Sequence, residues 1–491
     1  MRADPTSRPL GPWIALLAAP ACAFVAVSLP NLRPRNGYIV LGTLAGLAFL
    51  GAVLAIARQR AWVADHVRGL LLMGCFAAAP IAFGKYLTEK SDVFVTTLGI
   101  AVWAPDFLLV GSAAICLLFF TLPERRALRW TLGAFSPLIA FVVVQALVAP
   151  FSKSPTLGFY EVVRYLVALA LSVVLVRILE RRDLPYVVAG LLVSAVVQSV
   201  FAAGQYYRGW TFGQEIFGQS AGVLVGTFGD ASTVRVTGLM GFPNALGTFL
   251  VMVLPIAVAL AVTPQRLLVR LAGLGVLAAG IPALIFTFSR GAWLCFAAAT
   301  VLVLLYELHR RPARDQLLLA SIGAFALLVI GVVVYIFYGD QIAARIKYSP
   351  AESLEIRSQL NWAALRVLRE NPIFGVGPNV FPLELLGSNE SDAVAPAHDL
   401  YLLVLAEAGV VGFVLFAAQI LRCLRPPRWP IEGRGIEEVD AIRIGLWAGF
   451  IAFLLHQVVD ITYAMPAVFR VVWLVATLLL FLQRPPERAT P

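Results

Sequence analysis

Arg290 is the first residue whose position suggests chemistry, because it stands in the connector Ser289-Arg290-Gly291 between two apolar runs. An arginine at the centre of a membrane helix costs roughly 2.5–3.5 kcal/mol, and less near the membrane surface. We therefore expect Arg290 at the outer rim of a membrane or inside a helix bundle. A guanidinium there can bind phosphate oxygens through paired hydrogen bonds, or it can simply reach the lipid headgroups.

His398 is the second candidate, and the chemistry it could supply is proton transfer. It opens the sequence His398-Asp399-Leu400-Tyr401-Leu402, where a long polar segment enters an apolar run. An unperturbed histidine has a pKa of about 6.5 and can accept a proton at neutral pH. The alternative interpretation is a polar residue that only marks the membrane interface.

Three further arginines stand at places where a cation could meet a ligand. Arg235 precedes the segment 241–244, in which Pro243 fits the first turn of a helix. Arg357 falls in a stretch with helical spacing of its apolar residues. Taken singly, these two are typical of solvated surface arginines. Arg164 differs because it sits within an apolar helix, where a charge is a functional candidate by default.

His456 and Asp460 are four residues apart in an apolar segment. This spacing predicts that they share one face of a helix. A hydrogen bond that holds the bundle together and a catalytic role are both compatible with it.

The spacing of the remaining ligand-type residues argues against metal and nucleotide chemistry. The five cysteines contain no C-x-x-C, and the four histidines show no H-E-x-x-H, so we expect no metal and no cofactor. The net charge is +10, but the basic residues are spread between apolar runs, which excludes a nucleic-acid partner.

The elements that must position these residues are membrane helices. The chain is 60% hydrophobic and 13% charged, whereas a soluble domain is about 45–50% apolar and about 25% charged. A spanning helix needs about 20 mostly apolar residues. We predict an all-α polytopic membrane protein with about fourteen such helices, over 13–29, 37–57, 69–87, 105–122, 130–149, 157–176, 185–207, 242–262, 268–288, 291–308, 316–338, 398–421, 444–463 and 467–482.

The distribution of basic residues predicts the orientation. A cytoplasmic N-terminus places 23 of the 38 lysines and arginines inside and 13 outside, and the other two, Arg164 and Arg470, within helices. Both termini are then cytoplasmic. The first 30 residues could instead be a cleaved signal peptide, but a first membrane helix is the favoured interpretation.

Two segments are longer than the connections of about 2–8 residues that are usual in helix bundles, and both fall outside. The first is the loop 208–241, and the second is the loop 339–397. We divide the chain into three parts. Residues 1–338 hold eleven helices and the outer loop 208–241, residues 339–397 form the second outer loop, and residues 398–491 hold three helices and the cytoplasmic connector 422–443. Ser353–Glu370 has the spacing of an amphipathic helix that ends at Asn371-Pro372. That helix could lie on the membrane surface or cover a site, and we expect the chemistry on the periplasmic side.

Taken together, these segments resemble the O-antigen ligase and polymerase family. The resemblance covers roughly the second half of the chain. Two departures are Asp399, where the family often has asparagine, and Pro243, which lacks the asparagine that often precedes it. The resembling segments are Arg235 to Asn244, Ser289-Arg290-Gly291-Ala292-Trp293, Ile356-Arg357 with Trp362, Asn371-Pro372-Ile373-Phe374-Gly375-Val376-Gly377, His398-Asp399-Leu400-Tyr401-Leu402 with Glu407-Ala408-Gly409, and His456 with Asp460.

The resemblance implies a metal-independent, inverting, GT-C-like glycosyltransferase of the bacterial inner membrane. Its donor would be an undecaprenyl-diphosphate-linked glycan, and its acceptor a glycan or lipid A-core, with membrane lipid around both. His398 would be the base. Arg290, Arg235, Arg357 and Arg164 would bind the diphosphate, and Asp399, Tyr401, His456 and Asp460 would support them.

Three alternatives stay open from the sequence. Within the family, ligases and polymerases are not separated, although fourteen predicted helices exceed the twelve typical of ligases. A transporter or flippase of lipid-linked glycans would need charges along a central path and internal repeats, whereas the charges here gather at the outer side. A scaffold subunit of an envelope assembly complex is the third possibility.

Overall fold

The computed structural model describes the chain in several stretches, which hold most of its second half. They are residues 60–82, 84–86, 101–103, 105–106, 109–110, 125–209, 224–228, 231–310, 338–340, 342–344, 347, 351–386, 394–425 and 436–484. Within them, seven helices are long and apolar enough to cross a membrane by length and composition. The predicted helices 13–29, 37–57 and 316–338 lie outside these stretches, as does most of 105–122.

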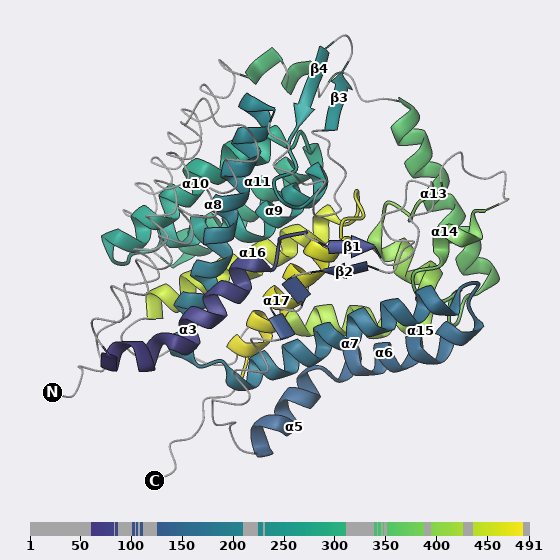
Figure 1. The fold of residues 1–491 in the computed structure, drawn as a ribbon, viewed down its shortest axis with the longest axis horizontal. Coiled ribbons are helices and arrows are strands. Elements are labelled where there is room, and N and C mark those ends of the chain that lie inside the picture. Colours follow the sequence, from purple (N-terminus) through teal and green to yellow (C-terminus); the bar gives the residue numbers. More distant parts are fainter. Residues whose placement is uncertain are drawn as a thin grey trace.

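Helices dominate the architecture (Figure 1). They are α3 (Arg60–Ala78), α5 (Arg125–Ala134), α6 (Ser136–Val148), α7 (Pro155–Ile178), α8 (Leu184–Arg208), α9 (Pro243–Val262), α10 (Leu267–Phe286), α11 (Arg290–His309), α13 (Ala351–Glu370), α14 (Phe381–Glu384), α15 (Leu400–Cys423), α16 (Ile436–His456) and α17 (Pro466–Leu482).

Two groups of helices make up the bundle, and several predicted site residues lie near the boundary between them. In one, α8, α10, α11 and α16 surround α9, which is buried along nearly its whole length. In the other, α6, α7, α15 and α17 pack together. The turn 457–465, which joins α16 to α17, runs from the first group to the second.

Several predicted boundaries are close to the observed ones because hydropathy alone defines them. The segments 157–176, 185–207, 242–262 and 268–288 correspond to α7, α8, α9 and α10. The amphipathic helix is also present, as α13, and its apolar side is buried at Leu360, Ala364 and Val367. Since α13 packs on α15, that side faces the protein.

Three predicted helices are wrong in extent. The segment 69–87 is helical only to Ala78, because Pro80 lacks the N–H that a continuing helix needs. The segment 130–149 is divided between α5 and α6, with Pro137 in the first turn of α6. The segment 444–463 ends at His456, so Asp460 is not on the helix and the predicted shared helical face of His456 and Asp460 is incorrect.

Two short antiparallel hairpins add to the predicted all-α architecture. The strands β1 (Gly84–Tyr86) and β2 (Ala101–Trp103) form one, and β3 (Leu224–Phe228) and β4 (Ala231–Arg235) form the other. The second hairpin places its last residue, Arg235, at the beginning of α9, where it contacts Asn244.

The helix α15 is interrupted at Gly409, which has φ 63° and ψ −172°. A break in a membrane helix frees backbone groups that must find partners. The segment 372–377, which follows α13, pairs with these groups on both sides of the break. The bonds are Val410 N to Pro372 O at 2.9 Å, Val411 N to Ile373 O at 3.2 Å, Val376 N to Ala406 O at 3.1 Å and Gly377 N to Glu407 O at 2.9 Å.

Gly409→Ala is expected to lower the stability of the protein by about 1–3 kcal/mol, because only glycine adopts this backbone conformation readily. The added Cβ would also stand 2.3 Å from the carbonyl oxygen of Ile373. Thermal unfolding in detergent measures the effect. The control is Gly275→Ala in α10, where a Cβ meets nothing within 4 Å. Equal melting temperatures for the two variants would contradict the tight junction between α15 and the segment 372–377.

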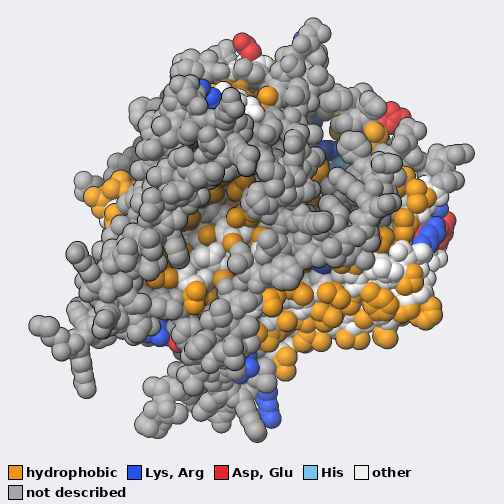
Figure 2. Space-filling view, viewed as in Figure 1, with side chains coloured by type: hydrophobic (Ala, Val, Ile, Leu, Met, Phe, Trp, Pro, Cys, Tyr) orange, Lys and Arg blue, Asp and Glu red, His pale blue; other side chains and the backbone are white. Residues whose placement is uncertain are grey.

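Apolar side chains form a broad band over α6 and α7, at the lower right of Figure 2. Phe151 is 88% exposed and Leu147 is 67% exposed. Exposed apolar side chains at this density suit contact with lipid tails, as expected for a membrane protein.

Candidate active site

Asp460 is the centre of a polar cluster where α9, α11 and the turn 457–465 meet. Asn244, in the first turn of α9, donates a hydrogen bond from Nδ2 to Asp460 Oδ2. Arg235 donates from Nη2 to Asn244 Oδ1 at 2.7 Å and from Nε to the carbonyl of Thr287 at 2.9 Å. These contacts join the second hairpin, α9 and the connector between α10 and α11 to Asp460.

His456 lies beneath this cluster and is fully buried. Thr248 Oγ1 is 3.0 Å from its Nδ1, and Ser289 Oγ is 3.5 Å from its Nε2. The same Thr248 hydroxyl contacts Thr462 at 2.8 Å. With both ring nitrogens close to neighbouring hydroxyls, His456 connects α16 to α9 and to Ser289, the residue before α11.

Arg290 is the first residue of α11, and the beginning of that helix packs against the turn after α16. A Cβ at the adjacent Gly291 would lie 3.0 Å from Val459 Cγ2 and 3.2 Å from His456 Cδ2. The first N–H groups of a helix and its dipole favour an anion nearby. Arg290, half-buried, therefore adds a fixed positive charge to an end of the helix that already favours negative charge.

Arg357 and His398 approach Asp460 from α13 and from the residues before α15. Arg357, on α13, donates from Nη1 to the carbonyl of Val459 at 3.2 Å. The backbone N–H of His398 donates to Asn361 Oδ1 at 3.1 Å, one helical turn beyond Arg357. His398 Nδ1 is buried, and within the described parts of the chain it has no hydrogen-bond partner.

Burial and neighbouring charges set the protonation of two residues of this cluster. Burial lowers the pKa of His398 below its usual value; Asp460 opposes this shift, and Arg357 adds to it. A lowered pKa leaves the imidazole neutral and able to take a proton at pH 7. Burial also lowers the pKa of Arg235, to about 10, with Asp460 raising it and Arg357 lowering it. Arg235 therefore remains charged.

Asp399 and Tyr401 hold the beginning of α15 in place. Asp399 Oδ1 accepts hydrogen bonds from the backbone N–H of Tyr401 at 2.7 Å and of Leu402 at 3.1 Å, which is an N-terminal cap. The Tyr401 hydroxyl donates to the carbonyl of Leu454 on α16 at 2.9 Å. Both residues thus fix the position of the adjacent His398.

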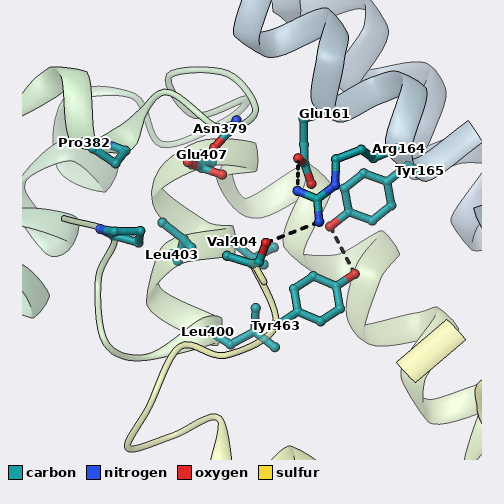
Figure 3. Close-up of a pocket in the computed structure, with 12 residues that line it drawn as sticks. Glu161, Arg164, Tyr165, Asn379, Pro382, Leu400, Leu403, Val404, Glu407 and Tyr463 are labelled. Carbon is teal, nitrogen blue, oxygen red and sulfur yellow. Dashed lines mark hydrogen bonds and ion pairs between the residues drawn. The ribbon is translucent and has the colours of Figure 1, made fainter. Parts of the chain in front are cut away.

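Arg164 is not brought into the Asp460 cluster. It pairs with Glu161 at 2.6 Å, donates to the carbonyl of Ala464 at 3.3 Å and lies over the Phe469 ring. These partners are in the second group of helices, beside a separate cavity (Figure 3).

Sequence reasoning missed Thr248 and Asn361 as parts of the site. Each is one helical turn from a residue that was noted, Asn244 and Arg357 respectively. Spacing of i and i+4 on the same face was the available signal. In the described stretches, no three His, Cys, Asp or Glu side chains gather as metal ligands would.

Two comparisons with known proteins bear on the chain. Residues 275–417 match the family model described as O-Antigen ligase, so this part of the chain is similar to the family that the sequence resembles. The matched range includes Arg290, Arg357 and His398. A search of curated proteins found no match.

Proposed function

We propose that this protein transfers a glycan from undecaprenyl diphosphate to an acceptor sugar at the periplasmic face of the inner membrane. The observation that carries the proposal is the convergence on Asp460 of two arginines, Arg235 and Arg357, with the histidine His398. Arg290 begins the helix that packs beside them. Cations for a departing diphosphate and a neutral base for a hydroxyl are the groups such a transfer needs.

The step is a direct displacement. His398 takes the proton of the acceptor hydroxyl as that oxygen forms a bond to the anomeric carbon of the donor sugar. The bond from that carbon to the diphosphate oxygen breaks, and its electron pair leaves with undecaprenyl diphosphate. Arg290, Arg235 and Arg357 stabilise the charge on the leaving group. Attack from the side opposite the leaving group inverts the anomeric configuration.

Asp460 has a positioning role in this scheme. Its carboxylate raises the pKa of His398, against the lowering by burial, and so favours the protonated form of His398 that arises during transfer. Through Asn244 it also fixes the orientation of Arg235. Asp460 therefore interacts electrostatically with the base His398 and, through Asn244, positions the cation Arg235.

The test is to incubate the purified protein in lipid nanodiscs with the undecaprenyl-diphosphate glycan, with and without lipid A-core, and to separate the products by size. Lengthened lipid-linked glycan without lipid A-core indicates a polymerase, and glycan attached to lipid A-core indicates a ligase. Absence of both products from folded protein would contradict the proposal.

The proposal also places the cluster on the outer side of the membrane. A cysteine at Trp362, which is 65% exposed on α13, is expected to react with an impermeant maleimide in intact cells. A cysteine at Arg182, whose side chain is 58% exposed between α7 and α8, should react only after permeabilisation. The reverse pattern would invert the orientation and place the cluster in the cytoplasm.

A further inference from the structure

A second polar site lies beside the Asp460 cluster, in a cavity between α7 and α15 (Figure 3). Glu161 and Arg164 come from α7, Glu407 from α15 and Asn379 from the segment before α14. The turn 457–465 contributes Tyr463 and Ala464 to the lining. The mechanism proposed above uses none of these side chains.

The charges in this cavity do not suit an anion. The guanidinium of Arg164 is already occupied by Glu161 and the carbonyl of Ala464, and both members of the ion pair are largely buried, at 14% and 12% exposed. Glu407 adds a second carboxyl group, which accepts a hydrogen bond from the N–H of Phe381 at 3.2 Å. The cavity therefore offers carboxyl oxygens as acceptors and amide and guanidinium groups as donors, without an excess of positive charge.

Such a mixture fits a neutral ligand with hydroxyl groups. A hydroxyl is both donor and acceptor, so it can bond a carboxylate and an amide at once. The cavity volume is about 40 Å³. This exceeds the about 10–15 Å³ that one water molecule needs, so the cavity can admit a hydroxyl or hydroxymethyl group.

The position of the cavity relative to His398 indicates which substrate it meets. Leu400, two residues after His398, lines it, as does Tyr463, three residues after Asp460. Arg235 and Arg290, by contrast, do not line the cavity: Arg235 bonds to Asn244 of α9 and to Thr287, and Arg290 is the first residue of α11. A donor held by its diphosphate at Arg235 and Arg290 leaves this cavity, whose lining includes neither of them, to the acceptor.

We infer that the cavity between α7 and α15 binds a hydroxyl-bearing edge of the acceptor sugar and so contributes to acceptor specificity. This inference rests on the proposed glycan transfer. Glu161 is the residue that presents a carboxylate to that edge, and Arg164 holds Glu161 in place. Arg164 then acts on the acceptor only by positioning Glu161. The diphosphate is bound by Arg235, Arg290 and Arg357.

Two variants test the inference in the nanodisc assay. Glu161→Asp keeps the charge opposite Arg164 but withdraws the carboxylate oxygens by one methylene. Leu403→Phe keeps every charge and fills the cavity, which Leu403 lines. Each is expected to raise the acceptor KM by about tenfold or more, since a hydrogen bond to a charged group is lost or blocked. The donor KM should stay unchanged, because the arginines are untouched.

The matched control is Glu307→Asp, which shortens another buried carboxylate, one that accepts a hydrogen bond from Thr263 at the opposite end of the bundle. Its acceptor KM should equal that of the unsubstituted protein. Melting temperatures identify a variant that fails to fold. If Glu161→Asp fails to fold, the acceptor KM of Leu403→Phe decides the test. An unchanged acceptor KM in the folded variants, or a rise in the donor KM instead, overturns the acceptor subsite. No transfer by the unsubstituted protein would contradict the proposed function itself.

Discussion

His398→Gln is expected to lower the rate of glycan transfer by about 10²–10⁴-fold, which is the usual contribution of a positioned base. Glutamine keeps a hydrogen-bonding side chain of similar size but cannot take a proton. The cap that Asp399 forms on α15 involves other atoms, so the helix should begin as before. Donor binding should also persist, because the arginines remain. Turnover, donor affinity and membrane level are measured in the same preparation.

The pH dependence provides a second measure of the same role. The neutral imidazole is the active form, so transfer should be lost as the pH falls through the pKa of His398. Because burial lowers that pKa, the acidic limb of the profile should lie below pH 6.5, the ordinary histidine value. The same limb in His398→Gln, or transfer near the unsubstituted rate, would show that another group is the base.

Arg290→Ala is expected to reduce transfer by about 10²–10³-fold, as is typical when one preorganised charge donor is removed. Arg290→Lys should restore only part of the rate, because an ammonium keeps the charge but loses the planar pair of donors. Transfer rates from the labelled donor at equal membrane levels measure both.

Arg182→Ala is the control, because Arg182 is an exposed arginine paired with Glu180 in the connector between α7 and α8. Full activity of Arg290→Ala would leave Arg290 as a residue that only reaches the lipid headgroups. Arg235 is a less clean target, since its side chain also holds Thr287 and Asn244.

The sequence predicted the membrane helices well where hydropathy changes sharply. The helix α9 begins at Pro243 and ends before the polar segment 263–266, and both limits are visible in the sequence. The end of α16 was not visible, because Val458, Val459 and Ile461 continue the apolar pattern. The structure ends the helix there through Gln457, whose side chain accepts from the N–H groups of Thr462 and Tyr463.

The sequence indicated which residues could form the candidate site, but not which of them lie close together. Loop charge places Arg235, Arg290, Arg357 and His398 on one side of the membrane, and the structure brings Arg235, Arg357 and His398 together around Asp460. Arg164 was expected with them. Sequence gives the depth of a residue in a bundle but not the direction in which its helix faces, and α7 turns Arg164 toward Ala464 and Phe469.

The backbone pairing at Gly409 could not be predicted from the sequence. The glycines at 375, 377 and 409 were part of the family resemblance, but their purpose depends on two segments about 30 residues apart meeting in space. The contact explains Gly375 and Gly409, since a Cβ on Gly375 would lie 2.4 Å from the backbone of Glu407, whereas a Cβ on Gly377 would lie 2.5 Å from Ser152.

The most direct test of glycan transfer at the Asp460 cluster is to follow one turnover with a donor labelled in its glycan. The label entering the acceptor and the undecaprenyl diphosphate released are measured together. We expect one released diphosphate for each glycosidic bond formed, an inverted anomeric configuration in that bond, and neither product with His398→Gln. Movement of the label across the bilayer with no new bond, or equal transfer by His398→Gln, would contradict the account.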